Sequence, residues 1–499
     1  MSITSHSDKK SLTRHSSILF IGKCLEFAIH LLHPIILVRV LSQMDYGLYR
    51  QLMLVFSTLL PIGYMGMTQA LYYFIPRFPE NRHAIVLQTV IFCSGVGAII
   101  LGGLTIFKVP VAGLFHSSEM AAFLPFIGLY SFFMIASAAI EPSLIAERRT
   151  KAASVVLVLT QFAQSTIIIT TVLIRPEIRA MLIALIAFSF CRLATQLVYF
   201  KLHYRWTFNS FDKATFKEQI AYALPVGIGN IAWFFQLKMN QFFVSYFFDA
   251  RNFAIYSVGA FNLPLVNMVT SSVANVMIPE LSRFQKSGQT KEILRVWYNS
   301  IRKMNLIIYP LFVFFFCFAN EFIVIMFTRQ YIESAIIFRI GLIGLMVVGI
   351  NAGAVLNAYA QNKYLMHLGF ARLPVSILML YVFTTMWGMV GAMSANVLLS
   401  ILFQGIVLIK VAKVIGISYS KVLQWGVNAK ILSACLIAIF PLVLANTYLS
   451  VPPLTMLLVA APVFFVGYAG SSIMLGTLQR QETLFFQNLL KQFIGLRSV

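Results

Sequence analysis

Charged residues are scarce in this chain, and acidic residues are the scarcest. Only 11% of the 499 residues are charged, with 16 Asp and Glu against 38 Lys and Arg. Hydrophobic residues make up 59% of the chain, and the mean hydropathy is +0.83. These values lie well outside the range of soluble globular proteins, which excludes a soluble enzyme or a soluble nucleic-acid-binding protein.

Motifs for metal binding and hydrolysis are also missing. The five cysteines stand singly in apolar runs without a C-x-x-C pair, so they indicate small core residues and neither a zinc site nor a disulfide framework. No P-loop, H-E-x-x-H or G-x-S-x-G motif occurs, and no outer connection is large enough for a glycosyltransferase or polymerase domain. We predict a protein that is not an enzyme, with no catalytic residue, metal or cofactor.

Long apolar runs dominate what remains. About fourteen of them have the length that a transmembrane helix needs. The predicted spans are 17–40, 49–75, 84–107, 120–146, 152–174, 179–201, 219–247, 254–279, 304–328, 334–360, 364–386, 388–412, 428–449 and 453–477. Polar residues interrupt the first run, so we expect an uncleaved first helix and not a signal peptide. The sequence predicts an all-α polytopic membrane protein.

Basic residues collect in alternate connections between the spans. If the N-terminus is cytoplasmic, the inside connections and the tail carry most of the Lys and Arg. The positive-inside rule therefore predicts both termini in the cytoplasm and an even number of spans. The net charge of +22 then reflects topology and not nucleic-acid binding. The 281–303 connection is amphipathic, which predicts a helix lying on the inner surface or a solvated linker.

An internal repeat is present at an offset of a little over two hundred residues. The corner D-Y-G-L-Y at 45–49 matches N-F-A-I-Y at 252–256, and L-x-A-x-x-x-x-K occurs at 144–151 and again at 356–363. The offset spans six helices, so the copies enter the membrane in the same direction. This predicts two six-helix parallel repeats, a site between them near the midplane, and two extra C-terminal helices. The predicted parts are an N-terminal lobe at 1–201, a linker at 202–218, a C-terminal lobe at 219–414, a peripheral pair at 415–477 and a tail at 478–499.

Polar stripes mark the first helix of each repeat. In the first span, the polar residues Lys23, Glu26, His30 and His33 fall within about a quarter of the helix circumference. In the seventh span, a similar stripe consists of Asn230, Lys238, Gln241 and Ser245. Ionisable residues at bilayer depth usually face a bundle interior or a water-filled cavity, because exposure to lipid costs at least about 3 kcal/mol each. We therefore expect both stripes to face a cavity.

The corner motifs resemble those of a known family. The pattern R-V-L-S-Q-M-D-Y-G-L-Y, followed by a helix ending in Y-Y-F-I-P-R-F, is similar to that of polysaccharide-repeat (Wzx-like O-antigen and capsule) flippases. These belong to the multidrug/oligosaccharidyl-lipid/polysaccharide exporter superfamily, whose fold is MATE-like. The second half agrees through Y-A-L-P at 222–225 and V-M-I-P-E-L-S at 276–282. One departure is Lys238-Met239-Asn240, where many relatives are expected to carry an Asp.

The resemblance implies export of an undecaprenyl-diphosphate-linked oligosaccharide across a bacterial inner membrane. Such a path needs cations and hydrogen-bonding groups for the diphosphate and sugars. The cations predicted inside spans are Lys23, Arg192, Lys238, Arg339 and Arg372. Lys238 and Arg192 are the main candidates because neither has an acidic neighbour in sequence. Asn230 and Gln241 would add amides. Five further asparagines would contact sugars, although hydrogen bonding between helices is the commoner role of a single Asn in a membrane helix; they are Asn262, Asn267, Asn275, Asn351 and Asn357.

Several alternatives stay open. Lys23 and Glu26 can neutralise each other, although Glu26 and His30 are also the candidates for ion coupling. Glu141 beside Pro142 is interpreted as a snorkelling or capping residue, and Arg50 as an interfacial anchor. Besides the carrier lipid, the expected partners are membrane lipids and polysaccharide polymerase or assembly proteins. A cation-coupled multidrug antiporter and a non-transporting assembly scaffold remain alternative functions.

Overall fold

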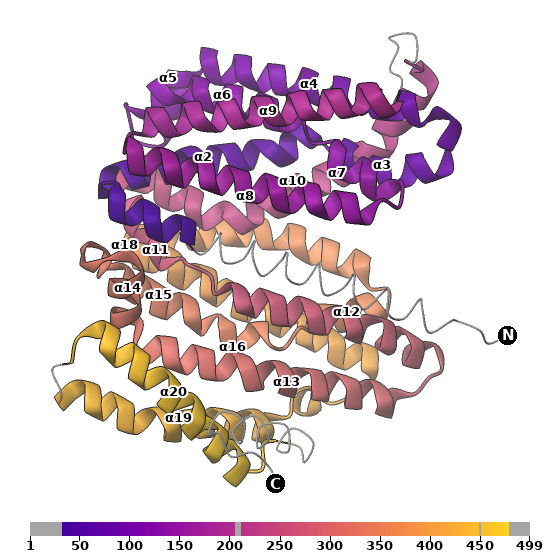
Figure 1. The fold of residues 1–499 in the computed structure, drawn as a ribbon. Helices are drawn as coiled ribbons and strands as arrows, with labels where there is room; N and C mark the ends of the chain where they lie inside the picture. The colour runs from indigo at the N-terminus through magenta and orange to yellow at the C-terminus, as the bar shows by residue number, and fades with distance from the viewer. Residues whose placement is uncertain (1–31, 205–210, 449–450, 479–499) are drawn as a thin grey trace, which may run out of the picture. The chain divides into compact units, whose positions relative to one another are not determined.

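The structure is a computed structural model that describes residues 32–204, 211–448 and 451–478. The regular structure of these residues is helical throughout (Figure 1). The chain divides into two compact units between Ser257 and Val258. This division is based on packing. The predicted lobes and the linker at 202–218 were defined by the sequence repeat instead, so they remain a separate prediction.

The first unit begins in the described chain with a helix at 32–40. Its other helices are α2 (Gln43–Tyr64), α3 (Met67–Arg77), η1 (Pro79–Asn81), α4 (Arg82–Ile106), α5 (Lys108–Leu114), α6 (Met120–Ala136), α7 (Ile140–Ala146), α8 (Thr150–Ile174), α9 (Ile178–Tyr204), α10 (Lys213–Phe247) and most of α11 (Ala250–Gly259). α6 packs against α4, α9 and α2, and α10 packs against α2, α3 and α4. The helix of the seventh predicted span therefore lies against the first helices of this unit.

The second unit contains the longest helix, α18, and several short ones. Its helices are α12 (Pro264–Lys286), α13 (Thr290–Cys317), α14 (Ala319–Phe327), η3 (Arg329–Tyr331), α15 (Ser334–Ile343), α16 (Leu345–Val348), α17 (Ala352–Ala358), α18 (Asn362–Ile415), η4 (Tyr419–Lys421), α19 (Trp425–Tyr448) and α20 (Pro453–Met474). α13 is central, because it packs against α12, α15, α19 and α20.

The helices agree closely with the predicted spans. Among the described residues, 11 helices are long and apolar enough to cross a membrane, or 12 if α11 and α12, bent by 50°, form one span. α18 covers two predicted spans and contains a kink at Trp387 and Gly388, whose φ of 62° favours glycine. Most of the predicted 17–40 span lies outside the described residues. The predicted total of about fourteen is compatible with these helices.

The predicted repeat is visible in the local backbone. α7 and α17 both contain seven residues, and the second residue after each helix has a left-handed backbone: Arg148 with φ 63° and Ala360 with φ 54°. The next N–H then returns to the carbonyl of the motif leucine: Arg149 N to Leu144 O at 2.8 Å, and Gln361 N to Leu356 O at 2.9 Å. This bond satisfies a carbonyl at each helix end. The two motif copies therefore end a short helix in the same way.

The two corner motifs also share their start. Ser42 Oγ accepts a hydrogen bond from Asp45 N at 3.0 Å, and Asp249 Oδ1 accepts one from Asn252 N at 2.8 Å. These side chains stand at matching repeat positions and satisfy a backbone donor in the first turn of α2 and of α11. The corner residues of both copies thus begin a helix through the same contact.

The prediction for 281–303 is only partly right. The segment is helical, but it continues α12 and α13. Its apolar residues Ile293, Trp297 and Ile301 are at most 3% exposed and pack against α12, α17 and α18. Trp297 Nε1 donates to Ile350 O at 3.4 Å. The apolar face covers the protein core and not a lipid surface, because α13 lacks a break at which the segment would turn away.

The cysteines differ in their environments. Cys93 and Cys435 are buried, as predicted for small core residues. Cys317 is partly exposed. Cys191 on α9 is exposed, so the prediction is wrong there. All four are free thiols.

Candidate functional site

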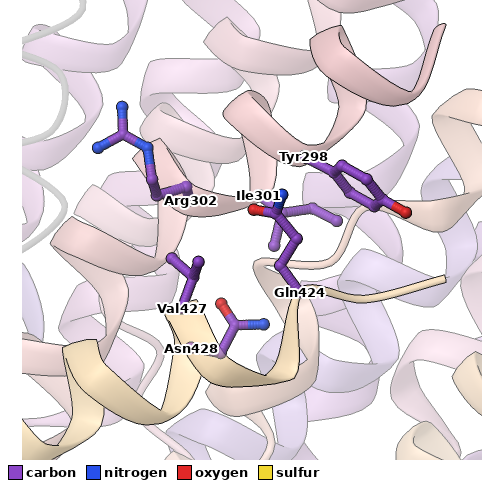
Figure 2. Close-up of a pocket in the computed structure, with 6 residues that line it drawn as sticks. All are labelled: Tyr298, Ile301, Arg302, Gln424, Val427 and Asn428. Atoms are coloured by element: carbon purple, nitrogen blue, oxygen red, sulfur yellow. The ribbon is translucent and has the colours of Figure 1, made fainter. Parts of the chain in front are cut away.

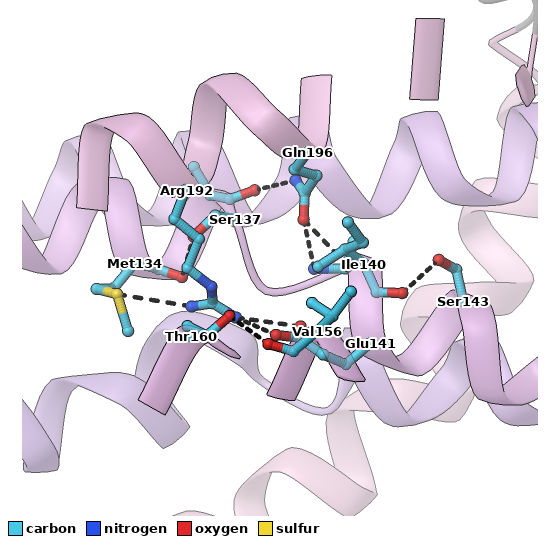
Figure 3. Close-up of polar contacts among 11 residues, drawn as sticks. Met134, Ser137, Ile140, Glu141, Ser143, Val156, Thr160, Arg192 and Gln196 are labelled. Atoms are coloured by element: carbon cyan, nitrogen blue, oxygen red, sulfur yellow. Dashed lines mark hydrogen bonds and ion pairs between the residues drawn. The ribbon is translucent and has the colours of Figure 1, made fainter. Parts of the chain in front are cut away.

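An ion pair joins α9 to α7 in the first unit (Figure 3). Arg192 Nη2 donates to Glu141 Oε1 at 2.8 Å and to Oε2 at 3.1 Å, and both side chains are 14% exposed. Arg192 Nη1 lies 3.5 Å from the sulfur of Met134 on α6. The anion that sequence reasoning expected for Arg192 is therefore Glu141, a residue of the same protein.

The backbone beside this pair is broken, and a buried amide repairs it. Between α6 and α7 the helix is interrupted, which frees peptide groups from intrahelical hydrogen bonds. Gln196 Oε1 accepts from Ala139 N at 3.1 Å and from Ile140 N at 3.0 Å, while its Nε2 donates to Ala136 O at 2.8 Å (Figure 3). Gln196 is fully buried. One α9 side chain thus satisfies three polar groups that the apolar surroundings would otherwise leave unpaired.

The sequence interpretation of Glu141 is wrong. Its carboxylate neither caps a helix nor extends to an exposed end, because it accepts from Arg192. The missed signal was the pair of residues Glu141 and Pro142 after the small residues 136–139, a combination typical of an interrupted helix. Identifying the partner required the packing of α9, which is 51 residues further along the chain.

Two other cations of the first unit have no acidic partner among its described residues. Arg50 lies on α2 and Lys238 on α10, and these helices pack together. Both residues are partly buried, and Arg50 Nε is enclosed without an acceptor. Arg50 is close enough for its charge to act on the Lys238 ammonium. Two like charges in a partly buried place create a positive field that an anionic ligand would neutralise. The interpretation of Arg50 as an interfacial anchor does not account for its buried Nε.

The rest of the seventh-span stripe is mixed. Asn230 and Gln241 are partly exposed, and their side chains make no hydrogen bond to the described residues. Ser245 is fully buried. Asn240, which the sequence did not single out, donates from Nδ2 to the buried Tyr256 hydroxyl at 2.8 Å. Asn230, Lys238 and Gln241 are therefore the partly exposed polar residues of this stripe. Asn240 instead stabilises the second corner, at 252–256.

The predicted cations of the second unit have partners that carry no charge. Arg339 Nε donates to Phe316 O at 3.1 Å. Arg372 Nη2 lies 3.4 Å from Ser400 Oγ, and its guanidinium is 5.4 Å from the centre of the Phe403 ring. Neither cation is neutralised by an acid in the described chain. Both keep a positive charge that a ligand can use.

Three predicted residues, Lys23, Glu26 and His30, lie outside the described residues, and their roles stay predictions. His33 is described and lies edge-on to Tyr49, with ring centroids 6.3 Å apart.

A small recess in the second unit is structural (Figure 2). Its lining residues are Tyr298, Ile301, Arg302, Gln424, Val427 and Asn428. Arg302 Nη1 donates to Thr477 O at 3.0 Å, and Asn428 Oδ1 accepts from Asn305 at 3.0 Å. Tyr298 donates to the carbonyl of Lys421. These bonds join α13, α19 and the segments around them, so the polar groups hold the unit together.

The comparison with protein families decides the identity at family level. The family described as "Polysaccharide biosynthesis protein" matches residues 36–336, more than half of the chain. The chain belongs to this family. No curated protein sequence matches it. The family resemblance predicted from the corner motifs is confirmed, since the matched segment contains both corners.

Solved structures show the fold of the family member. The lipid II flippase MurJ in an inward closed conformation aligns with a TM-score of 0.74 at 14% identity, covering 95% of this chain and 99% of that chain. An inward-facing MATE transporter of the MOP superfamily gives 0.60 at 12% identity, covering 78% and 94%. A mutant of the Vibrio cholerae MATE transporter VcmN gives 0.55 at 13% identity, covering 81% and 96%. The predicted MATE-like fold of a multi-pass membrane protein is confirmed.

Proposed function

We propose that this family member is a flippase for an undecaprenyl-diphosphate-linked oligosaccharide repeat unit. It moves the carrier from the inner to the outer leaflet of a bacterial inner membrane, with both termini in the cytoplasm, for assembly of surface polysaccharides such as O-antigen. The family's description and a fold similar to that of a lipid II flippase support this proposal. The carrier lipid is the substrate, and polymerase or assembly proteins are proposed partners.

The observation that carries the proposal is the pair Arg50 and Lys238. Two partly buried cations on adjacent helices, without an acidic partner in the described chain, fit a dianionic diphosphate. A hydrogen bond to a charged group makes a net contribution of about 1.5–3 kcal/mol, so two such contacts would favour binding of a diphosphate by about 3–6 kcal/mol. A site for a cationic drug would favour acidic and aromatic groups instead.

Other predicted residues take supporting roles in the proposal. Asn230 and Gln241 lie on α10 with Lys238 and would hydrogen-bond the same headgroup. Lys23, Arg192, Arg339 and Arg372 are the further cations of the path. Arg192 is a weaker ligand than Lys238, because Glu141 already neutralises its charge.

The proposed mechanism is alternating access by the two repeats. The first six predicted spans and the next six rock around the cationic path. The last two predicted spans help to admit the lipid tail. Glu26 and His30 are the proposed coupling groups. A proton or a sodium ion bound at Glu26 would change the charge that the diphosphate meets.

The test replaces the unpartnered cations in cells and measures surface polysaccharide. Lys238→Gln, Arg50→Gln and the double variant are compared with Lys238→Arg, which keeps the charge. Loss of one charge-assisted contact weakens carrier binding about tenfold or more. We expect less surface polysaccharide and accumulation of the lipid-linked precursor, at unchanged protein level, for the Gln variants only.

Lys217→Gln is the matched control, because Lys217 is an exposed lysine in the first turns of the same helix, α10. Wild-type polysaccharide in the double variant would contradict the flippase proposal. A change in drug resistance without a change in polysaccharide would favour the antiporter. Silent charge changes within the spans, together with loss of function from changes at 281–303, would favour the scaffold.

A further inference from the structure

α12 in the second unit has a polar stripe whose three residues are exposed in the described structure. Asn267, Ser271 and Asn275 are four residues apart and all exposed. At about 100° per residue they lie within about 80° of arc, and at 1.5 Å per residue they extend over about 12 Å. The helix has no charged residue from Pro264 to Pro279. The stripe is therefore polar, continuous and neutral.

The other faces of α12 have the composition expected for a membrane helix. Val266, Met277 and Leu281 are at most 3% exposed and form the face that packs into the unit. Leu265 and Val276 are 44% and 66% exposed on another side, where an apolar surface suits lipid. The amide stripe lies between these two faces. It differs from both, since it is exposed without being apolar.

Hydrogen bonds among the described residues do not explain the stripe. The amides of Asn267 and Asn275 make no hydrogen bond to the described residues, although interhelical bonding was the alternative predicted for them. Ser271 Oγ donates to Met268 O at 3.2 Å and keeps its acceptor capacity. By contrast, the nearby Thr270 is partly buried, and its hydroxyl donates to Val266 O at 2.9 Å. The two amides together offer donors and acceptors to an outside partner.

We propose that this α12 stripe binds the uncharged sugars of the lipid-linked oligosaccharide. This inference rests on the proposed function, and it assigns the sugars of that carrier to residues that have no charge. Carbohydrate hydroxyls both donate and accept, as primary amides do, and need no charge for binding. A lipid chain would leave the amides unsatisfied, and an anion would favour a cationic site. The three residues extend over about 12 Å of the helix, at about 1.5 Å of rise per residue, so neighbouring sugar rings can each contact a different residue of the stripe.

The test compares two probes on the purified full-length protein in lipid nanodiscs. One probe is bare undecaprenyl diphosphate. The other is undecaprenyl diphosphate bearing its oligosaccharide, extracted from cells that lack this protein. The ratio of their dissociation constants is measured for the wild type, for Asn267→Leu and Asn275→Leu singly and together, and for the control Thr270→Val. Binding of the bare probe also shows that each variant is folded.

We expect the double Asn variant to weaken binding of the glycosylated probe about tenfold, as two neutral hydrogen bonds predict, and to leave binding of the bare probe unchanged. Each single variant gives part of this loss, and Thr270→Val gives none. An unchanged ratio, or equal loss of both probes, overturns the inference. A wild-type protein that binds neither probe contradicts the proposed function itself, which distinguishes the two failures.

Discussion

Arg192 on α9 donates from one nitrogen to both carboxylate oxygens of Glu141 on α7, at 2.8 and 3.1 Å. The pair lies just after the break between α6 and α7, where Gln196 already satisfies the freed backbone groups. Two side chains of α9 therefore hold the same interrupted helix, one by charge and one by hydrogen bonding. The residue that corresponds to Glu141 in the second repeat is Gly353, so the second half lacks this carboxylate at the start of α17.

Removing the charge of Glu141 is expected to destabilise the protein. Glu141→Gln leaves Arg192 without a counter-charge in a site where each side chain is only 14% exposed. Breaking one side of a buried ion pair costs about 3 kcal/mol. Thermal unfolding of the purified protein, followed by tryptophan fluorescence, should show a clearly lower midpoint.

The matched control for this variant is Glu292→Gln. Glu292 pairs with Arg295 at 2.7 Å, but these side chains are 36% and 68% exposed. An exposed pair contributes about 0–1 kcal/mol, so the control should melt like the wild type. Equal midpoints for Glu141→Gln and Glu292→Gln would show that the buried pair does not stabilise the fold.

Gln196→Leu is expected to destabilise the backbone at the break between α6 and α7. The substitution keeps side-chain volume but removes the groups that bond Ala136 O, Ala139 N and Ile140 N. Leaving such buried groups unpaired costs about 1–3 kcal/mol each, less whatever the backbone recovers by moving. Hydrogen exchange at 136–143 should rise strongly. Gln161→Leu, at a partly buried α8 position without a hydrogen bond in the described chain, serves as control and should leave this exchange unchanged.

Gly47→Ala is expected to disturb the corner between α2 and α11. A Cβ at Gly47 would stand 1.7 Å from the carbonyl oxygen of Ala250, which is backbone and cannot rotate away. Overpacking of this kind costs about 1–3 kcal/mol. Gly102→Ala on α4 meets nothing within 4 Å and is the control. A melting midpoint of Gly47→Ala equal to that of Gly102→Ala would contradict this close approach.

Asp212 should give the start of α10 a dependence on pH. The hydroxyl of Thr215 and the backbone N–H groups of Ala214 and Thr215 donate to its carboxylate, which lowers its pKa below 3.8. A lowered pKa in the folded state means that the cap contributes fully above about pH 4 and is lost as the pH falls further. Exchange protection of the first α10 turn, corrected for intrinsic rates, should therefore stay constant above about pH 4 and decrease as the pH falls below that value.

Asp212→Asn provides the comparison for this pH dependence. Asn also caps helices but does not titrate, so its protection should stay constant over the same range. The same pH dependence in both proteins would show that another group is responsible.

Most of the helical architecture was predictable from local properties. The span 219–247 is α10, and the span 152–174 is α8, because about 20 apolar residues in a row need no partner to indicate a membrane helix. The interruptions within spans were not predicted. At Met65 and Gly66, between α2 and α3, the backbone turns left-handed, and a Cβ at Gly66 would stand 2.2 Å from Ala223 O. Such a break forms because another helix packs against it, which hydropathy does not report.

The candidate site was also predictable only in part. The sequence by itself determined that Lys238 and Arg192 are cations in membrane helices, since composition and spacing suffice for that inference. Only the tertiary structure decided that Arg192 is neutralised by Glu141 and that Lys238 is near Arg50. Whether a cation is paired depends on how helices far apart in sequence pack and rotate. The free-energy difference between a paired and an unpaired buried cation is several kcal/mol, but no local sequence pattern reports which of the two is present.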